Sequence, residues 1–125
     1  MIDTRSTPKT GETTTLWLIK ILTGPILVIV ALVHVWINHT AGSAAGNLMT
    51  FEDILVYYQN PLIPLMEIIF LVSVVAHSLL GLRGIILDLK PGAAALKLWD
   101  GAFVVLGAGS VLYGVWLIFA ILAYV

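Results

Sequence analysis

The sequence predicts an all-α integral membrane protein with three transmembrane helices. Three observations support this fold class: a low content of charged residues, three long apolar stretches, and basic residues confined to one side. Of the 125 residues, 60% are hydrophobic and 10% are charged. A soluble domain carries about a quarter charged residues, and a disordered chain combines low hydrophobicity with high charge. Both classes are therefore excluded.

Composition also limits the function. The chain contains no cysteine, which excludes thiolate metal sites, disulfides and a cysteine nucleophile. Its net charge of −1 provides no basic field for nucleic acid. The partners expected from composition are therefore lipid and other membrane helices.

Three stretches are long and apolar enough to cross a bilayer. A membrane helix needs about 20 mostly apolar residues, because the hydrocarbon layer is roughly 30 Å thick. The predicted spans cover residues 16–38, 61–83 and 101–124. Residues 1–15 are polar and are predicted to form a cytoplasmic tail, which leaves residues 16–125 as a single transmembrane domain.

Orientation follows from the positions of the basic residues. The loop over residues 40–60 and the C-terminus contain no lysine or arginine. The positive-inside rule therefore predicts a cytoplasmic N-terminus and a C-terminus outside, in a multi-pass protein of the cell (inner) membrane. The basic residues on the predicted cytoplasmic side are Arg5, Lys9, Lys20, Arg83, Lys90 and Lys97.

The second half of the outer loop has a helix-start signal. Thr50 is placed to cap a short interfacial helix, and Asp53 lies in its predicted first turn. Tyr57 and Tyr58 at its end suit the membrane–water interface. We expect this helix to lie along the outer surface of the membrane.

Three ionisable residues inside the predicted spans, His34, Glu67 and His77, are the first candidates for function. Such residues are costly in a bilayer and usually functional. A neutral imidazole is a common axial ligand of haem iron, but a histidine that is only hydrogen-bonded within the bundle is the more frequent case. Glu67 is a candidate proton-relay group or, alternatively, a neutral hydrogen-bonding group at a subunit interface.

The two histidines are predicted to lie at different depths. His34 follows Lys20 by 14 residues and His77 precedes Arg83 by 6 residues, so their levels differ by about 12 Å on antiparallel helices. An axial nitrogen lies only about 2 Å from its metal. One iron therefore cannot hold both. If both histidines bind haem, there are two haems, and each takes its second ligand from another chain.

Several small or charged residues surround these positions. Gly81 is four residues after His77, on the same helix face, where it leaves room for a flat macrocycle or for a neighbouring helix. Arg83 has the geometry to pair a haem propionate, with snorkelling to lipid headgroups as the alternative. The small residues of the third span allow close approach either of a partner helix or of a helix of this chain; they are Gly107, Ser110 and Gly114.

The run from His77 to Asp88 resembles the second-helix signature of the membrane-anchor subunits of succinate:quinone oxidoreductases (complex II), of the smaller D type. In those subunits a haem-ligating histidine is followed by glycine at the fourth position, often arginine at the sixth, and aspartate at the eleventh. His77, Gly81, Arg83 and Asp88 match this pattern. The stretch from Lys20 to His34 is similar to the first helix of the same subunits.

This resemblance implies a haem b-binding anchor of succinate dehydrogenase or fumarate reductase, which helps pass electrons to membrane quinone. It implies one or two haem b groups shared with a partner anchor: His77 ligates the haem nearer the cytoplasm, and in a two-haem type His34 ligates a second haem nearer the outer face. The implied partners are a second membrane anchor subunit, an iron–sulfur subunit and a flavoprotein subunit. The chain is then a non-catalytic subunit of an oxidoreductase complex.

Two departures from the family pattern concern the quinone site. Many of these anchors have a tyrosine directly after the aspartate, whereas Leu89 follows Asp88 here, and Ile21 stands where some relatives have an arginine. The chain is therefore expected to supply only part of a quinone pocket. Its candidate residues for that pocket are Asp88, Lys20, Trp17 and Thr23.

Two other functions are compatible with the sequence. The first is a haem-free anchor of the same complex, in which both histidines are structural. The second is a small transporter or channel subunit that uses Glu67 as its ion or proton site. Transporters usually contain paired repeats, and no repeat beyond the three spans is visible in the sequence.

Overall fold

The computed structural model describes residues 11–41 and 49–125. These residues form four helices: α1 (Thr14–Ala41), α2 (Phe51–Tyr58), α3 (Leu62–Asp88) and α4 (Ala93–Leu122). Most of the predicted N-terminal tail, including Arg5 and Lys9, lies outside the described residues, as does part of the predicted outer loop. In length and composition α1, α3 and α4 are each able to cross a membrane. The predicted all-α fold with three spanning helices is confirmed.

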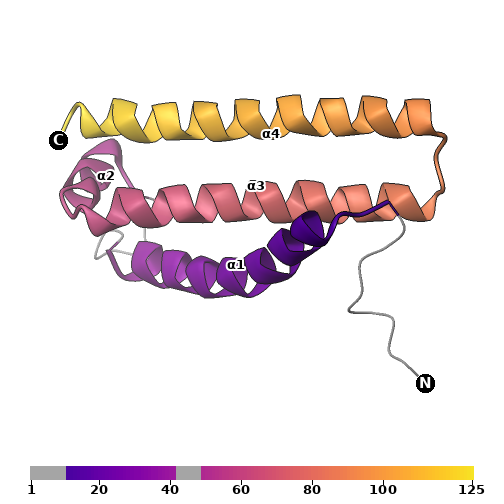
Figure 1. The fold of residues 1–125 in the computed structure, drawn as a ribbon. Helices are drawn as coiled ribbons and strands as arrows, with labels where there is room; N and C mark the ends of the chain where they lie inside the picture. The colour runs from indigo at the N-terminus through magenta and orange to yellow at the C-terminus, as the bar shows by residue number, and fades with distance from the viewer. Residues whose placement is uncertain (1–10, 42–48) are drawn as a thin grey trace, which may run out of the picture.

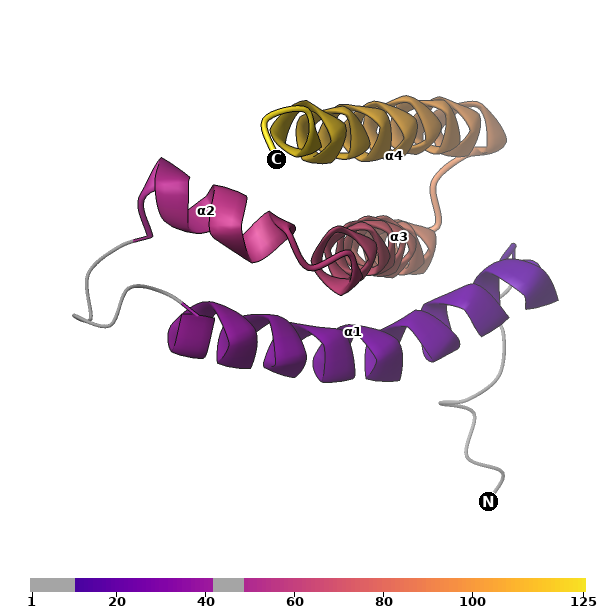
Figure 2. The ribbon, with the colours of Figure 1, turned by 90° about the vertical axis from the view of Figure 1, so that its left-hand side faces the viewer.

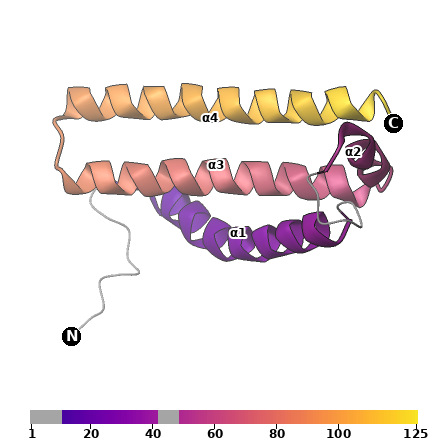
Figure 3. The ribbon, with the colours of Figure 1, turned by 180° about the vertical axis from the view of Figure 1, so that it is seen from behind.

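The three long helices form an open row. α3 lies in the middle, with α1 packed along one side and α4 along the other (Figure 1), and the view from behind shows the same order (Figure 3). The short helix α2 crosses the end of the row near the C-terminus, where it contacts both α3 and α4 (Figure 2). The four described basic residues are located at or toward the opposite end, where α1 begins and α3 is connected to α4.

The row has very little interior of its own. A small core at the α2 end consists of Tyr58, Ile63 and Ile118. Elsewhere large apolar side chains face outward, and Trp36 and Val105 are 72% and 75% exposed. Apolar surface on this scale requires a nonaqueous environment. Lipid and the helices of partner subunits are the surroundings that satisfy this requirement.

Two of the helices extend beyond the predicted spans. α3 continues to Asp88, beyond the predicted end at residue 83, and α4 begins at Ala93, before the predicted start at residue 101. Hydropathy marks the part of a helix that matches the hydrocarbon layer, whereas backbone hydrogen bonding continues into the polar interface. α3 ends where Lys90 adopts a φ of 50° directly before Pro91, which disfavours a helical conformation of the preceding residue.

Helix α1 is bent, and its bend lies beside α3 (Figure 1). Pro25 is inside the helix and has no N–H to donate to the carbonyl of Ile21 one turn earlier. In the same turn the Thr23 hydroxyl donates to the carbonyl of Ile19 over 2.7 Å. The backbone before Pro25 is therefore less regular than in the rest of the helix.

Helix α2 starts at a complete capping box. The Thr50 hydroxyl accepts a hydrogen bond from the Asp53 backbone N–H over 3.2 Å, and the Asp53 carboxylate accepts one from the Thr50 backbone N–H over 2.9 Å. Two N–H groups that a helix start leaves unpaired are satisfied in this way. This cap fixes the position at which the chain turns back toward α3.

The small residues of α4 divide between two faces. A Cβ atom at Gly107 would lie 2.9 Å from Leu79, and one at Gly114 would lie 2.5 Å from Leu71, both on α3. These two glycines therefore serve packing within the chain. A Cβ at Gly109 would meet nothing within 4 Å among the described residues, so that face of α4 is open to lipid or a partner.

Candidate functional site

His77 is seated against the bent turn of α1. Its Nδ1 atom lies 3.3 Å from the Lys20 carbonyl oxygen and 3.4 Å from the Thr23 hydroxyl. A Cβ atom at Gly24 would be 3.3 Å from Cε1 of His77, closer than most side-chain contacts. The absence of a side chain at Gly24 thus allows the imidazole edge to approach the backbone of α1.

This seat defines which nitrogen of His77 can act as a ligand. When Nδ1 carries the proton and donates it to a carbonyl, Nε2 retains a lone pair. Histidines that bind metals are commonly oriented in this way by a carbonyl or carboxylate at the other nitrogen. Among the described residues, Nε2 of His77 has no hydrogen bond or ion pair. In that tautomer, the Nε2 lone pair of His77 is not used by any of the described residues.

A side chain at Gly81 would touch neither the His77 side chain nor a second helix in the described part of the chain. A Cβ atom there would meet nothing within 4 Å, so the space beside it is open to a group from outside the chain. The glycine that does touch His77 is Gly24 on α1, which the sequence analysis missed. Spacing rules relate residues within one helix, but a Gly-Pro pair inside a helical stretch is a signal of a distorted turn and could have indicated this position.

Arg83 is bound to Asp100 of α4. Its Nε donates to Oδ1 over 2.6 Å and its Nη2 donates to Oδ2 over 3.1 Å, which is the paired geometry that arginine forms with carboxylates. Its Nη1 also donates to the Gly11 carbonyl over 3.4 Å. The prediction offered a propionate or lipid headgroups as partners, whereas the structure provides a carboxylate within the chain. Asp100 was missed, although it is the one acidic residue of α4.

The candidate quinone residues fall into two groups. Lys20 and Thr23 lie at the seat of His77, and the Lys20 ammonium is paired with Glu12 over 2.6 Å. Trp17 is half-buried one turn before Lys20. Asp88 is exposed at the end of α3, and its position eleven residues after His77 corresponds to about 16 Å along the helix. The structure thus brings Lys20 and Thr23 to His77 but leaves Asp88 distant.

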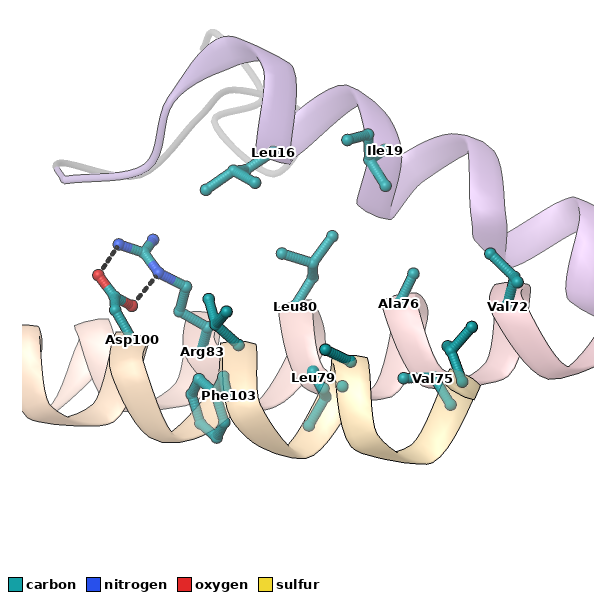
Figure 4. Close-up of a pocket in the computed structure, with 14 residues that line it drawn as sticks. Leu16, Ile19, Val72, Val75, Ala76, Leu79, Leu80, Arg83, Asp100 and Phe103 are labelled. Atoms are coloured by element: carbon teal, nitrogen blue, oxygen red, sulfur yellow. Dashed lines mark hydrogen bonds and ion pairs between the residues drawn. The ribbon is translucent and has the colours of Figure 1, made fainter. Parts of the chain in front are cut away.

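An apolar groove runs over α3 between α1 and α4. It has a volume of about 670 Å³, and the Arg83–Asp100 pair lies at the end of the groove near the connection between α3 and α4 (Figure 4). Leu16 and Ile19 of α1 and Phe103 of α4 form parts of its walls. His77 is not among the residues that line it. The groove and the seat of His77 therefore occupy different faces of α3.

A second polar site lies between α1 and α3, nearer to α2 than the site of His77. Nδ1 of His34 on α1 is 3.1 Å from Oε1 of Glu67 on α3, although the two atoms are not oriented for a regular hydrogen bond. The imidazole ring stacks on Phe70, with 4.9 Å between ring centroids and 28° between planes. His34 and Glu67, which the sequence placed at similar depths, are in contact.

The two histidines occupy separate levels of the α1–α3 interface. On α1, His34 lies 10–14 residues beyond the Lys20–Gly24 turn that contacts His77, a distance of about 15–21 Å. On α3, Glu67 lies 10 residues before His77, about 15 Å along the axis. The described residues contain no cluster of three or more metal-ligating side chains. Each level thus has a single imidazole.

Comparison with known families relates the chain to a family of membrane subunits. The family model of the succinate dehydrogenase/fumarate reductase transmembrane subunit matches residues 4–117 of this chain. The chain belongs to this family. This membership agrees with the resemblance of the His77–Asp88 run and identifies the protein as a multi-pass membrane subunit of such a complex. Searches of curated proteins and of solved structures give no significant match.

Proposed function

We propose that this transmembrane subunit is a haem b-binding anchor, which docks the flavoprotein and iron–sulfur subunits and helps pass electrons to membrane quinone. The observation that carries the proposal is the seat of His77. The Lys20 carbonyl lies at Nδ1, and Nε2 is left without a partner among the described residues. An imidazole held in this manner has the correct tautomer for an axial ligand.

The residues present fit a haem. His77 is the proposed ligand nearer the end of the row that carries the lysines and arginines, which we call the basic end. The open space at Gly81 allows a flat group to approach the same face of α3. His34 is the proposed ligand at the second level. When bound, haem b supplies one-electron transfer at a potential set by ligands, burial and nearby charge. The chain contributes the imidazoles and their orientation.

A partner anchor is part of the proposal. Each level of the α1–α3 interface has a single imidazole, and a six-coordinate haem iron takes two axial ligands. The second ligand at each level would therefore come from a second membrane anchor subunit. The extensive exposed apolar surface of the row supports the presence of such a subunit.

The quinone site is proposed to lie near His77 at the basic end. Thr23 has a hydroxyl whose proton is donated to the Ile19 carbonyl, which leaves its oxygen free to accept, and Lys20 lies beside it. Trp17 could provide an aromatic surface one turn away. Asp88 would take part only through a pocket that extends toward the end of α3. The remaining groups would come from the partner anchor and the iron–sulfur subunit.

The test is the number of haem b groups per subunit, measured by pyridine haemochrome assay on the intact purified complex. We expect two in the wild type and one in each of the variants His77→Ala and His34→Ala. His39→Ala, which changes an exposed histidine at the end of α1, is the matched control and should retain both. A wild-type complex without haem would show that the subunit is a membrane anchor that does not bind haem. An unchanged haem content in His77→Ala would refute the assignment of that ligand.

A further inference from the structure

The Nδ1 atoms of the two candidate ligands lie next to different kinds of oxygen atom. Nδ1 of His77 faces a neutral backbone carbonyl, that of Lys20, at 3.3 Å. Nδ1 of His34 faces a side-chain carboxylate, that of Glu67, at 3.1 Å. A carboxylate attracts the Nδ1 proton more strongly than a carbonyl does, and so makes the other nitrogen more basic. The two imidazoles are therefore chemically unequal.

Two residues besides Glu67 contact His34, one at its ring and one at its backbone carbonyl. Phe70 stacks against one face of the ring, and the Asn38 side-chain amide donates to the His34 carbonyl over 2.7 Å. The side chains of His34 and Glu67 are 30% and 17% exposed. A carboxylate in such a setting is costly unless it has a partner. Among the described residues, the imidazole of His34 is the basic group that lies within 4 Å of the Glu67 carboxylate.

Helix α2 provides a second group near Glu67. The hydroxyl of Tyr57 is buried without a hydrogen bond among the described residues. Burial first, and then the negative charge of Glu67, raise the pKa of Tyr57 to about 12. The phenol therefore stays protonated and is a neutral group near the carboxylate. Because Tyr58 of α2 packs with Ile63 of α3 and Ile118 of α4, α2 is held against the start of α3, the helix that carries Glu67.

We propose that Glu67 is a positioning residue for His34: its carboxylate holds the Nδ1 edge of the imidazole, directs Nε2 to the haem iron, and lowers the reduction potential of that haem relative to the haem at His77. This inference rests on the proposed function, because it requires a haem at His34. It assigns to Glu67 a role in orientation and electron donation. In this role Glu67 neither binds a transported ion nor transfers a proton in catalysis.

The first experiment compares Glu67→Gln with the wild type in the intact purified complex. Glutamine has the same shape and keeps an oxygen beside Nδ1, but it removes the charge. We expect both haems to be retained, the midpoint potential of the His34 haem to shift to more positive values, and the potential of the His77 haem to stay unchanged. Glu52→Gln, on the exposed side of α2, is the matched control and should shift neither. A Glu67→Gln complex with both haems and unaltered potentials would overturn the inference.

A second variant separates orientation from charge. Glu67→Leu removes both the charge and the oxygen atoms, so the imidazole loses the polar group that lies beside its Nδ1 atom. We expect partial or complete loss of the His34 haem, with altered low-spin resonances in electron paramagnetic resonance spectra of any haem that remains. Full retention with wild-type resonances would contradict the positioning role.

Failure of the proposed function gives a different result. If His34→Ala retained both haems, His34 would not be a ligand, and the inference would be overturned together with that assignment. If His34→Ala loses one haem but both Glu67 variants behave as wild type, only the role of Glu67 is refuted.

Discussion

The close contact of α4 with α3 at Gly114 leads to a sharp stability prediction. A Cβ atom at Gly114 would lie 2.5 Å from Cδ2, 3.1 Å from Cδ1 and 3.4 Å from Cγ of Leu71. Real Cβ contacts are not shorter than about 3 Å, so Gly114→Ala requires Leu71 to rotate or the helices to separate. In a membrane, close helix packing is itself a main source of association.

The expected cost follows from overpacking. Forcing an extra methyl group into a packed interface costs typically about 1–3 kcal/mol. The nearest atom is the end of a leucine side chain, which can yield in part, so we expect the lower part of that range, roughly 1–2 kcal/mol. This corresponds to a factor of about 5–30 in the ratio of unfolded to folded protein.

Gly109→Ala is the matched control, because it makes the same change in the same helix where a Cβ would meet nothing within 4 Å in the described part of the chain. Both variants share the gain in helix propensity of alanine over glycine, so their difference isolates the clash. The assay is the fraction of intact complex that remains during stepwise addition of SDS, measured by size-exclusion chromatography. If Gly114→Ala resists SDS as well as Gly109→Ala, the packing reasoning is wrong. The cost of Leu71→Ala should also be smaller in the Gly114→Ala background than in the wild type, because truncation relieves the clash.

Three further predictions concern the polar contacts. Asp100→Asn should weaken the α3–α4 contact by about 1 kcal/mol, because a charged partner of Arg83 becomes neutral, and the SDS assay should show a larger effect at low than at high salt. Gly24→Ala should push the imidazole of His77 away from α1 and should change the absorbance spectrum or the amount of one haem only; spectra identical to the wild type would contradict the seat described above. The pKa of Tyr57 is raised from 10.0 to about 12, so the stabilisation by its protonated phenol is kept below pH 10 and is lost as the pH rises toward 12. In an alkaline titration followed by phenolate absorbance, the wild type and Tyr57→Phe should differ only at the upper end of this pH range.

The sequence predicted the features that depend on composition and on the spacing of residues along a single helix. The number of spans follows from long apolar stretches, because a bilayer requires about 20 such residues for each crossing. The resemblance of the run from His77 to Asp88, a spacing within one helix, agreed with the family match. The similar depth of His34 and Glu67 also followed from the constant rise of a helix. These properties are set by composition and by distance along one helix.

The structure decided which helix faces meet. Gly24 at the edge of His77, Asp100 as the partner of Arg83 and the contact of Gly114 with Leu71 all join residues on different helices. Rotation of one helix about its axis changes each of these pairs without changing a single spacing in the sequence. The helix ends were also decided there, since hydropathy detects the hydrocarbon layer and the backbone continues beyond it. The sequence by itself therefore determined the membrane fold and the depth of its polar residues. Only the packing of α1, α3 and α4 determined what each polar residue touches, because contacts between helices depend on helix rotation and on small residues that permit close approach.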